Sequence, residues 1–291
     1  MNAQKIALLT DTGTNTPEEY ISRYDIRVAP LLITFSDGIT LRSGIDITAQ
    51  QLTDRLVHEV PKTSLPSPDT IRQLFEQAKN DGYESAVFVT ISSGLSATCQ
   101  TVRLIASQME DFPVVVVDSL SIGVAAGMVV MAAGRMIEEG VSFGALQAAL
   151  DAVARKTWVF FSTTTLEYLR KGGRISEPVY RLGSMLDIKP VITCNQSGHY
   201  VVARKARGWE RSLTTELSLA REKAAGFKVV RLAICCSDSC SGLFDSLEER
   251  LRNEMDGLGV EIESLVRSGV SADLLVHTGP DLVGIGVEGV R

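Results

Sequence analysis

The stretch SAVFVTISSGLSATCQTVRLI, residues 85–105, decides the fold class of this 291-residue chain. It opens with β-branched and apolar residues that predict a strand, and it continues through a loop rich in hydroxyl groups. It ends in the apolar spacing of a helix that starts near Leu95. Because strands that alternate with helices form parallel, doubly wound sheets, we expect an α/β fold around this segment.

Segments on both sides of this stretch repeat the alternation. The segment FSDGITLRSG predicts a glycine-containing turn that leads to a short edge strand. Asp69 is positioned to cap a helix that follows a loop dense in serine and proline. We predict strands at residues 5–10, 28–35, 85–91 and 112–118, and helices at residues 48–60 and 69–80.

The second half of the chain mixes hairpins with helices, which predicts an α+β second domain. A length of 291 residues is about twice the ~150 expected of one domain, so we divide the chain into domains at residues 1–157 and 158–291. We leave open a return of the last strands to the first domain. The predicted elements are strands at 158–162, 188–194, 199–206 and 229–236 and near Val260 and Leu274, with helices at 210–225 and 243–255.

Hydroxyl groups gather where the helix near Leu95 begins. Ser92, Ser93, Ser96 and Thr98 lie where the first backbone N–H groups of a helix have no partner. Such a helix start favours a carboxylate or a phosphate, and the carboxyl end of a parallel strand is where doubly wound sheets bind ligands. The alternative is an ordinary serine cap with no ligand.

A second hydroxyl cluster, formed by Thr63, Ser64 and Ser67 in KTSLPSPD, lies in another loop of the same half. Its alternative is an ordinary turn before a capped helix. The loop Asp11-Thr12-Gly13-Thr14 carries a single glycine, and GxxxxGK[ST] does not occur in the sequence. We therefore expect no nucleotide cradle in this chain.

Histidine and cysteine residues offer few candidates for chemistry. His277 follows an apolar run and precedes Thr-Gly-Pro, so it is either a site residue at a strand end or a core histidine. The five cysteines lack matching ligand spacing, and we expect buried, reduced thiols and no metal site. Since the N-terminal residues resemble a strand more than a signal peptide, we expect a cytoplasmic protein.

Composition and charge exclude several classes of protein. Hydrophobic residues make up 45% and charged residues 22%, which excludes disordered and collagen-like chains. The apolar stretch from Leu120 to Gly134 is shorter than the about 20 residues that span a bilayer, so we predict a buried helix and no membrane span. A net charge of −6 argues against nucleic acid as a partner.

The charge is unevenly distributed along the chain. Residues 170–211 contain nine basic and three acidic residues, a net charge of +6, so the rest of the chain carries −12. This stretch suits a docking or phosphate-facing surface, and the alternative is a solvated face. Its basic residues are Arg170, Lys171, Arg174, Arg181, Lys189, Arg204, Lys205, Arg207 and Arg211.

Several motifs in this order resemble the bacterial DegV family. They are SGIDIT, TSLPSP, ISSGLSATCQ, TLEYLRKGGRIS, LDIKPVI and HTGP. The resemblance covers essentially the whole chain. The most specific is LEYLRKGGRIS. The resemblance implies an α/β first domain and an α+β second domain with a long-chain fatty acid between them. It also implies a non-catalytic carrier that presents the carboxylate to a separate ATP-dependent kinase subunit, which forms an acyl phosphate.

The resemblance assigns roles to individual residues. Thr63 and Ser64 of TSLPS, with Ser96 or Ser93 of SSGLS, would bind the fatty-acid carboxylate, and His277 of HTGP would lie near it. Arg174 of GGRIS and Arg207 match basic positions associated with phosphoryl transfer or contact with the kinase. The fatty acid is the expected ligand, with no cofactor.

The chain departs from the family pattern at three places. Asp11-Thr12 stands where the family has Asp-Ser, and Ser96-Ala97-Thr98-Cys99 stands where it has SGTY. Asp281 replaces the last glycine of HxGPG, which would put a negative charge near the head group.

A different class of function is a serine hydrolase that acts on acyl esters, with Ser96 as nucleophile and His277 as base. The segment GLSAT is one glycine short of the G-x-S-x-G elbow, and the sequence identifies no acidic partner for the histidine. A regulator or binder of another small ligand is the remaining alternative.

Overall fold

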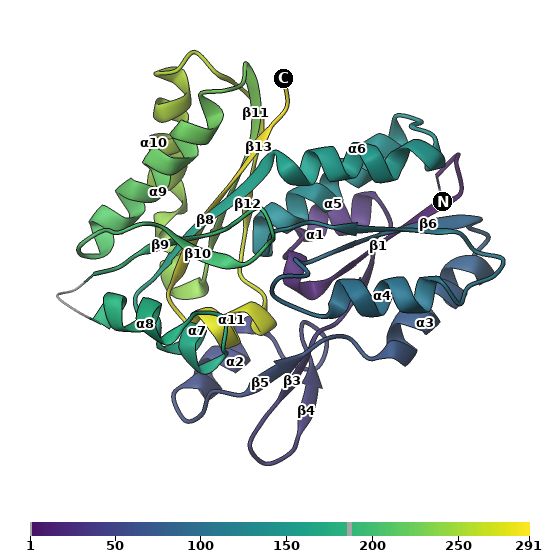
Figure 1. Ribbon diagram of the computed structural model, residues 1–291, viewed down its shortest axis with the longest axis horizontal. Helices are drawn as coiled ribbons and strands as arrows, with labels where there is room; N and C mark the ends of the chain where they lie inside the picture. Colours follow the sequence, from purple (N-terminus) through teal and green to yellow (C-terminus); the bar gives the residue numbers. More distant parts are fainter. Residues whose placement is uncertain (1, 185–187) are drawn as a thin grey trace.

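A four-stranded parallel sheet is built from the first half of the chain (Figure 1). The computed structural model describes residues 2–184 and 188–291. The strands follow the order β2 (Arg27–Ala29), β1 (Ile6–Asp11), β6 (Ser85–Thr90) and β7 (Val114–Asp118). The predicted strands at 5–10, 85–91 and 112–118 are thus confirmed as neighbours in one sheet. Helices α3 (Pro68–Asn80) and α4 (Thr98–Ala106) cover one face, and α5 (Gly123–Glu138) and α6 (Phe143–Arg155) pack on the other.

The strand predicted at 28–35 is two strands in different sheets. Pro30 interrupts it, because proline has no N–H to donate to a strand neighbour. The second part, β3 (Leu32–Thr34), joins an antiparallel sheet of three strands with β4 (Thr40–Arg42) and β5 (Lys62–Ser64). This small sheet projects below the rest of the molecule and carries the TSLPS loop (Figure 1).

A six-stranded sheet is built from the second half of the chain. Its order is β10 (Tyr200–Arg204), β9 (Val191–Cys194), β8 (Thr157–Thr163), β13 (Leu282–Gly289), β11 (Val229–Cys236) and β12 (Glu261–Ser268). Only β11 and β12 pair in parallel, so the sheet is mixed, as predicted for an α+β half. The helices of this half include α7 (Glu167–Lys171), α8 (Glu177–Ser184), α9 (Trp209–Ala224) and α10 (Phe244–Asp256), with the 3-10 helix η2 (Asp238–Leu243).

Helix α5 lies between the two large sheets. It contacts β1 and β6 of the first sheet and β8, β11 and β13 of the second. A helix enclosed on all sides must be apolar all round, which explains why its sequence from Gly123 to Gly134 is built of small and apolar residues. The predicted buried helix is confirmed. In the described part of the chain no helix is long and apolar enough to cross a membrane.

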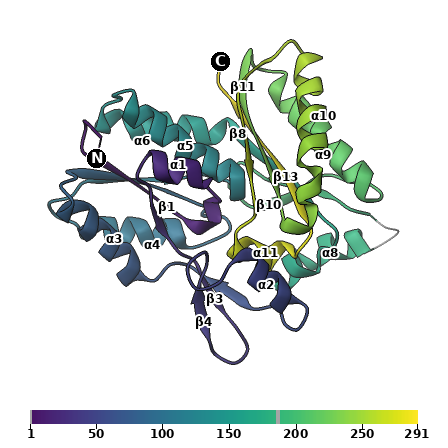
Figure 2. The same ribbon diagram turned by 180° about the vertical axis from the view of Figure 1, so that it is seen from behind.

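Residues near Leu274 form a helix, so the strand predicted there is wrong. Helix α11 (Ala272–Thr278) begins after Ser271 and ends at Gly279, whose φ of 77° suits glycine. These start and stop signals outweigh the short apolar run that had indicated a strand. Figure 2 shows α11 beside α2 (Ala49–Leu56), so the chain returns to elements of the first half at this point.

The final strand was not predicted, and it lies in the middle of the six-stranded sheet. Gly284 and Gly286 weaken the strand signal of LVGIGVEG, yet both are needed for close packing. A Cβ at Gly284 would lie 2.9 Å from the Cys235 sulfur, and one at Gly286 would lie 2.8 Å from the Met128 sulfur. β13 pairs with β8 and β11 and does not return to the four-stranded sheet.

Two helix starts differ from their predictions. Ser67, and not Asp69, caps α3, because Pro68 occupies the first helical position and Ser67 accepts a hydrogen bond from the Thr70 N–H. Helix α4 begins at Thr98, since residues 92–96 form a turn in which the Leu95 and Ser96 N–H groups donate to the Ser92 carbonyl. The remaining short helices are η1 (Thr12–Thr14) and α1 (Glu18–Arg23).

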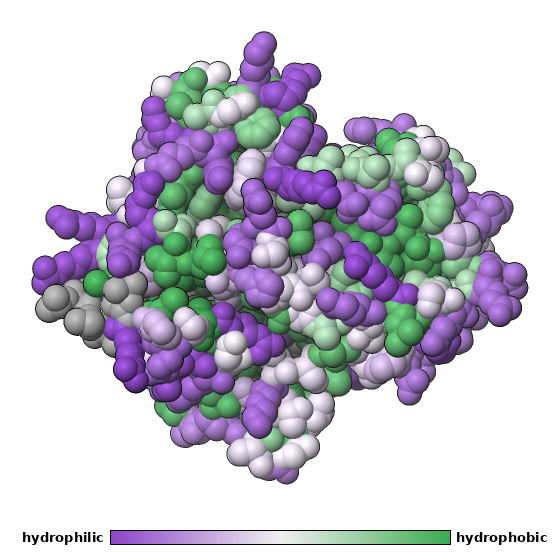
Figure 3. Space-filling view, viewed as in Figure 1, coloured by the Kyte–Doolittle hydropathy of each residue, from purple (hydrophilic) through white to green (hydrophobic). Residues whose placement is uncertain are grey.

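The apolar surface is divided among several patches. Figure 3 shows a face that is mostly hydrophilic, with smaller hydrophobic patches over both halves. All five cysteines are free thiols. No group of His, Cys, Asp or Glu within residues 2–184 and 188–291 is placed to hold a metal ion. Leu186 and Asp187, at the start of the LDIKPVI motif, lie outside the described residues.

Candidate functional site

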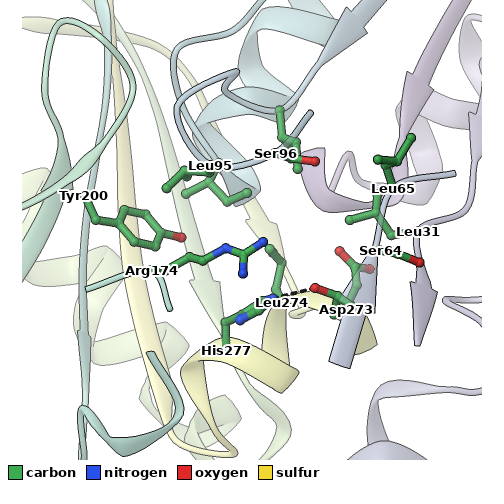
Figure 4. Close-up of a pocket in the computed structure, with 13 residues that line it drawn as sticks. Leu31, Ser64, Leu65, Leu95, Ser96, Arg174, Tyr200, Asp273, Leu274 and His277 are labelled. Atoms are coloured by element: carbon green, nitrogen blue, oxygen red, sulfur yellow. Dashed lines mark hydrogen bonds between the residues drawn. The ribbon is translucent and has the colours of Figure 1, made fainter. Parts of the chain in front are cut away.

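A cavity lined by both polar and apolar residues lies where the small sheet, helix α11 and the loop before α4 meet (Figure 4). Its volume is about 50 Å³. We call it the polar cavity. Its polar lining residues, which come from five separate segments of the chain, are Thr63, Ser64, Ser96, Arg174, Tyr200, Asp273 and His277.

A second cavity of about 30 Å³ adjoins the first. We call it the apolar cavity, because its walls are almost entirely hydrophobic. Ile122, Tyr200 and Leu274 line both cavities and mark their junction. The deeper lining residues include Val124, Val159, Phe161, Cys235, Val270 and Leu282. The two cavities therefore pair a polar end with an apolar end beside helix α5.

The histidine of the polar cavity is held by a threonine from the other half of the chain. His277 Nε2 lies 2.6 Å from Thr63 Oγ1, and the imidazole Nδ1 is buried without a hydrogen-bond partner among the described residues. Burial, with the Arg174 guanidinium nearby, lowers the pKa of His277 to about 3. The imidazole is therefore neutral at pH 7, and it can accept or donate through Nε2 depending on its tautomer.

The Gly-Gly turn after α7 makes room for this histidine. A Cβ at Gly172 would lie 2.1 Å from His277 Nδ1, which only a shift of the ring could relieve. Gly173 has a φ of 71°, which suits glycine and turns the chain toward Arg174. The turn thus brings a guanidinium and an imidazole to the same cavity.

Arg174 brings a positive charge into the cavity. Its guanidinium donates to the Gly172 carbonyl, and no ion pair of Arg174 is found among residues 2–184 and 188–291. Guanidinium groups bind carboxylates and phosphates through paired hydrogen bonds. An anionic ligand in the polar cavity would meet this charge.

Comparison with known proteins identifies the family of this chain. A family model described as "Uncharacterised protein, DegV family" matches residues 5–289. The chain belongs to the DegV family. A DegV domain-containing protein of Clostridium acetobutylicum is 32% identical over 286 residues, covering 97% of this chain and 98% of that protein.

Solved structures of DegV proteins share the fold. A DegV family protein from Thermus thermophilus, described as showing fatty acid binding, is 30% identical with a TM-score of 0.86 and full coverage of both chains. A stearic acid-binding protein from Eubacterium ventriosum is 25% identical with a TM-score of 0.85, and 98% of each chain is covered. The expected DegV resemblance and fold class are therefore confirmed.

The structure brings most of the predicted site residues together. Thr63, Ser64, Ser96, Arg174 and His277 all line the polar cavity, although up to 214 positions separate the two that form a hydrogen bond. Two predicted residues lie outside it. The Ser93 N–H donates to Asp118, and Arg207 is exposed in a bridge with Ile188.

Asp281, the residue that departs from the DegV pattern, does not line either cavity. Its carboxylate accepts hydrogen bonds from Thr164 Oγ1 at 2.9 Å and from Ser239 Oγ at 2.8 Å. The negative charge expected near the head group therefore lies outside both cavities, where two hydroxyl groups donate hydrogen bonds to it.

The geometry disfavours the serine hydrolase. Ser96 Oγ lies 2.8 Å from Thr98 Oγ1, while His277 Nε2 is paired with Thr63. An activated serine needs a hydrogen bond to its base, and that base needs a third group to orient it. Neither contact is present among the described residues.

Sequence reasoning missed two polar residues of the site. Tyr200 lies at the junction of the cavities, and burial raises the pKa of its phenol well above the usual value. Asp273 lies four positions before His277 on α11. A helical reading of SADLLVH would have placed both Asp273 and His277 on one face, because residues four apart are neighbours on a helix.

Proposed function

We propose that this chain binds a long-chain fatty acid, with the carboxylate in the polar cavity and the hydrocarbon tail in the apolar cavity. The observation that carries the proposal is the junction at Ile122, Tyr200 and Leu274, where a polar end meets an apolar one. Thr63, Ser96 and Arg174 offer donors to a carboxylate. Related DegV proteins described as fatty acid-binding support the same ligand class.

The two cavities make different contributions to binding. Burial of a hydrocarbon contributes about 0.8 kcal/mol per CH2, so a long tail supplies most of the affinity. The hydroxyl groups and Arg174 then orient the carboxylate. Ser64, also in the polar cavity, and Ser93, outside it, are secondary candidates for this role.

We also propose that the chain performs no catalysis of its own and acts in the bacterial cytoplasm. It would present the carboxylate to a separate ATP-dependent kinase subunit, which forms an acyl phosphate that feeds lipid metabolism. The charge of Arg174, whose guanidinium lines the polar cavity, suits the phosphate that develops there. The exposed Arg207 suits contact with the kinase.

The direct test is to identify the bound ligand. We expect protein purified from a bacterial host to release a long-chain fatty acid on extraction with organic solvent, detected by mass spectrometry. Native mass spectrometry should show the corresponding mass on the intact chain. A ligand-free protein that also fails to take up added fatty acid would contradict the proposal.

Removing head-group donors should weaken binding moderately. We expect Thr63→Ala or Ser96→Ala to cost about 0.5–1.5 kcal/mol, and up to ~3 kcal/mol if the hydroxyl bonds an ionised carboxylate. The double variant should cost more than either. Titration with a fluorescent fatty acid measures this, and Thr34→Ala is the matched control, since the Thr34 hydroxyl bonds that of Thr40 on the exposed small sheet. An unchanged double variant would move the head group elsewhere.

Adding one methyl group beside His277 should have a similar effect. In Gly172→Ala the new Cβ displaces the imidazole and breaks its contact with Thr63, so we expect affinity to fall by about 5- to 10-fold. The backbone tolerates alanine, because Gly172 has a φ of −75°. Gly144→Ala on α6 is the control, since nothing lies within 4 Å of its Cβ. Equal affinities in the two variants would refute the positioning role of Gly172.

A further inference from the structure

Asp273 is a buried carboxyl in the wall of the polar cavity. It is 1% exposed, and it lies on α11 one turn before His277. Oδ1 accepts a hydrogen bond from Ser43 Oγ at 2.5 Å, and the same hydroxyl accepts from the Asp273 N–H at 3.2 Å. Oδ2 is buried and has no hydrogen-bond partner among the described residues. Figure 4 shows this carboxyl between Ser64 and the Arg174 guanidinium.

An ionised Asp273 would conflict with the proposed ligand. Two carboxylates in one low-dielectric cavity repel each other, and a buried polar atom without a partner is costly. A neutral carboxyl removes both problems, because it has one oxygen that accepts and one O–H that donates. The Ser43 hydroxyl already occupies the accepting oxygen, which leaves Oδ2 to carry the proton.

Burial and the neighbouring hydroxyl groups act on Asp273 in opposite directions. Burial, the largest effect, raises the pKa of Asp273, while the hydroxyl groups of Ser43, Thr12 and Ser271 act to lower it. Asp11, at the end of β1, is also buried, and this burial, with Asp273 nearby, raises the pKa of Asp11 to about 7. Within the polar cavity the other titratable groups are Arg174, the neutral His277 and the phenol of Tyr200, whose pKa is raised by burial.

The elements packed against α11 present mainly uncharged groups to it. Helix α2 contributes Leu52 and Leu56, and α7 contributes Leu169 and Tyr168. The charged residues of α2 are engaged elsewhere, since Asp54 accepts from Gln50 and Arg55 pairs with Asp37. On α7, Lys171 pairs with Glu167, and Arg170 stacks on Tyr180 near Glu177. Lys62 of β5 is exposed.

We propose that Asp273 carries a proton on Oδ2 and donates it as a hydrogen bond to the carboxylate of the bound ligand. The cavity would thus recognise a single carboxylate as an acid–carboxylate pair, with Arg174 supplying the balancing positive charge. This role rests on the proposed function. It adds Asp273 as a ligand-binding residue and makes binding depend on a proton held by the protein.

The sign of the pH dependence follows from this proton. Ligand binding requires the neutral form of Asp273, so affinity is full below the pKa of Asp273 in the free protein. It falls as the pH rises through that value, by up to about 10-fold per pH unit. His277 does not contribute near neutral pH, because its pKa is about 3.

Asp273→Asn tests the proposal directly. The amide keeps both contacts, since its oxygen accepts from Ser43 and its NH2 donates to the ligand, yet it does not titrate. We expect the affinity of the wild-type protein for a fluorescent fatty acid to fall at least about 10-fold as the pH rises from below to above the pKa of Asp273, over the range in which the protein stays folded. Asp273→Asn should stay within about 3-fold over this range, and Asp273→Leu should bind weakly throughout. Titration of the fatty acid itself affects all three proteins equally.

Two further readouts keep the test decisive. Thermal melting at each pH shows whether a variant remains folded. Infrared difference spectroscopy of the loaded protein should show the C=O band of a protonated carboxyl that Asp273→Asn lacks.

Parallel pH profiles for the wild type and Asp273→Asn would overturn the role of Asp273 and point to Asp11 as the titrating group. A wild-type protein that binds no fatty acid at any pH would overturn the proposed function as well.

Discussion

Leu274→Trp is expected to lower the affinity for a long-chain fatty acid by at least about 100-fold. Leu274 lines both cavities at their junction, and its side chain is partly exposed to them. A tryptophan there would occupy the passage and keep the far end of the tail out of the apolar cavity. Excluding about four CH2 groups at about 0.8 kcal/mol each accounts for a loss of this size.

A series of acids of increasing length gives the sharpest measurement. In the wild type each added CH2 should raise affinity, whereas in Leu274→Trp the gain should stop once the chain reaches the blocked junction. Leu104→Trp is the matched control, because Leu104 lies 61% exposed on α4, away from both cavities. If Leu274→Trp followed the same length dependence as the wild type, the tail would lie elsewhere.

The parallel sheet and the buried helix could be predicted from local sequence. The strands that contain Ile6 and Val87 are continuous apolar runs, as expected for a sheet covered on both faces. The run from Gly123 to Gly134 is apolar all round, which indicates a buried helix but not its neighbours. That α5 separates two sheets is a property of the tertiary structure, since β8 and β13 reach it from distant parts of the chain.

The errors have local physical causes. Leu274 lies in an apolar run too short to separate strand from helix by periodicity, so the decision rests on Ser271 and Gly279 at its ends. The last strand was missed because Gly284 and Gly286 have low strand propensity, and only the packing against Cys235 and Met128 explains them.

The site could be predicted only in part. Hydroxyl clusters at strand ends and the family motifs identified Thr63, Ser96 and His277, because these features are local. Asp273 and Tyr200 carry no such signal, since their role depends on which side of α11 and β10 faces the cavity. Arg174 and Arg207 belong to one basic stretch, yet only Arg174 lines the polar cavity, because a basic stretch does not reveal which of its members turn inward.

Arg174→Ala is expected to lower acyl-phosphate formation with a cognate kinase subunit and ATP by at least about 100-fold. Binding of the fatty acid should change much less, by under about 10-fold, because the tail supplies most of the affinity. The reason is differential: the guanidinium faces one negative charge in the bound carboxylate but more charge as a phosphate develops. Arg174→Lys should form acyl phosphate at a rate between those of the wild type and Arg174→Ala, since lysine keeps the charge but not the paired hydrogen bonds.

Ionic strength separates this role from contact with the kinase. Arg174 lies in the wall of the polar cavity, so the loss in Arg174→Ala should persist at high salt. Arg207 is exposed, and we expect Arg207→Ala to reduce phosphoryl transfer at low salt. At high salt the transfer of the wild type should itself fall and the two proteins should become equal, because salt screens the encounter with the kinase. Arg252→Ala on α10, which removes an exposed pair with Glu248, controls for loss of charge alone. Equal losses of binding and transfer in Arg174→Ala would make Arg174 part of the binding pocket only, because a group needed for transfer must act more strongly on the transition state than on the bound acid.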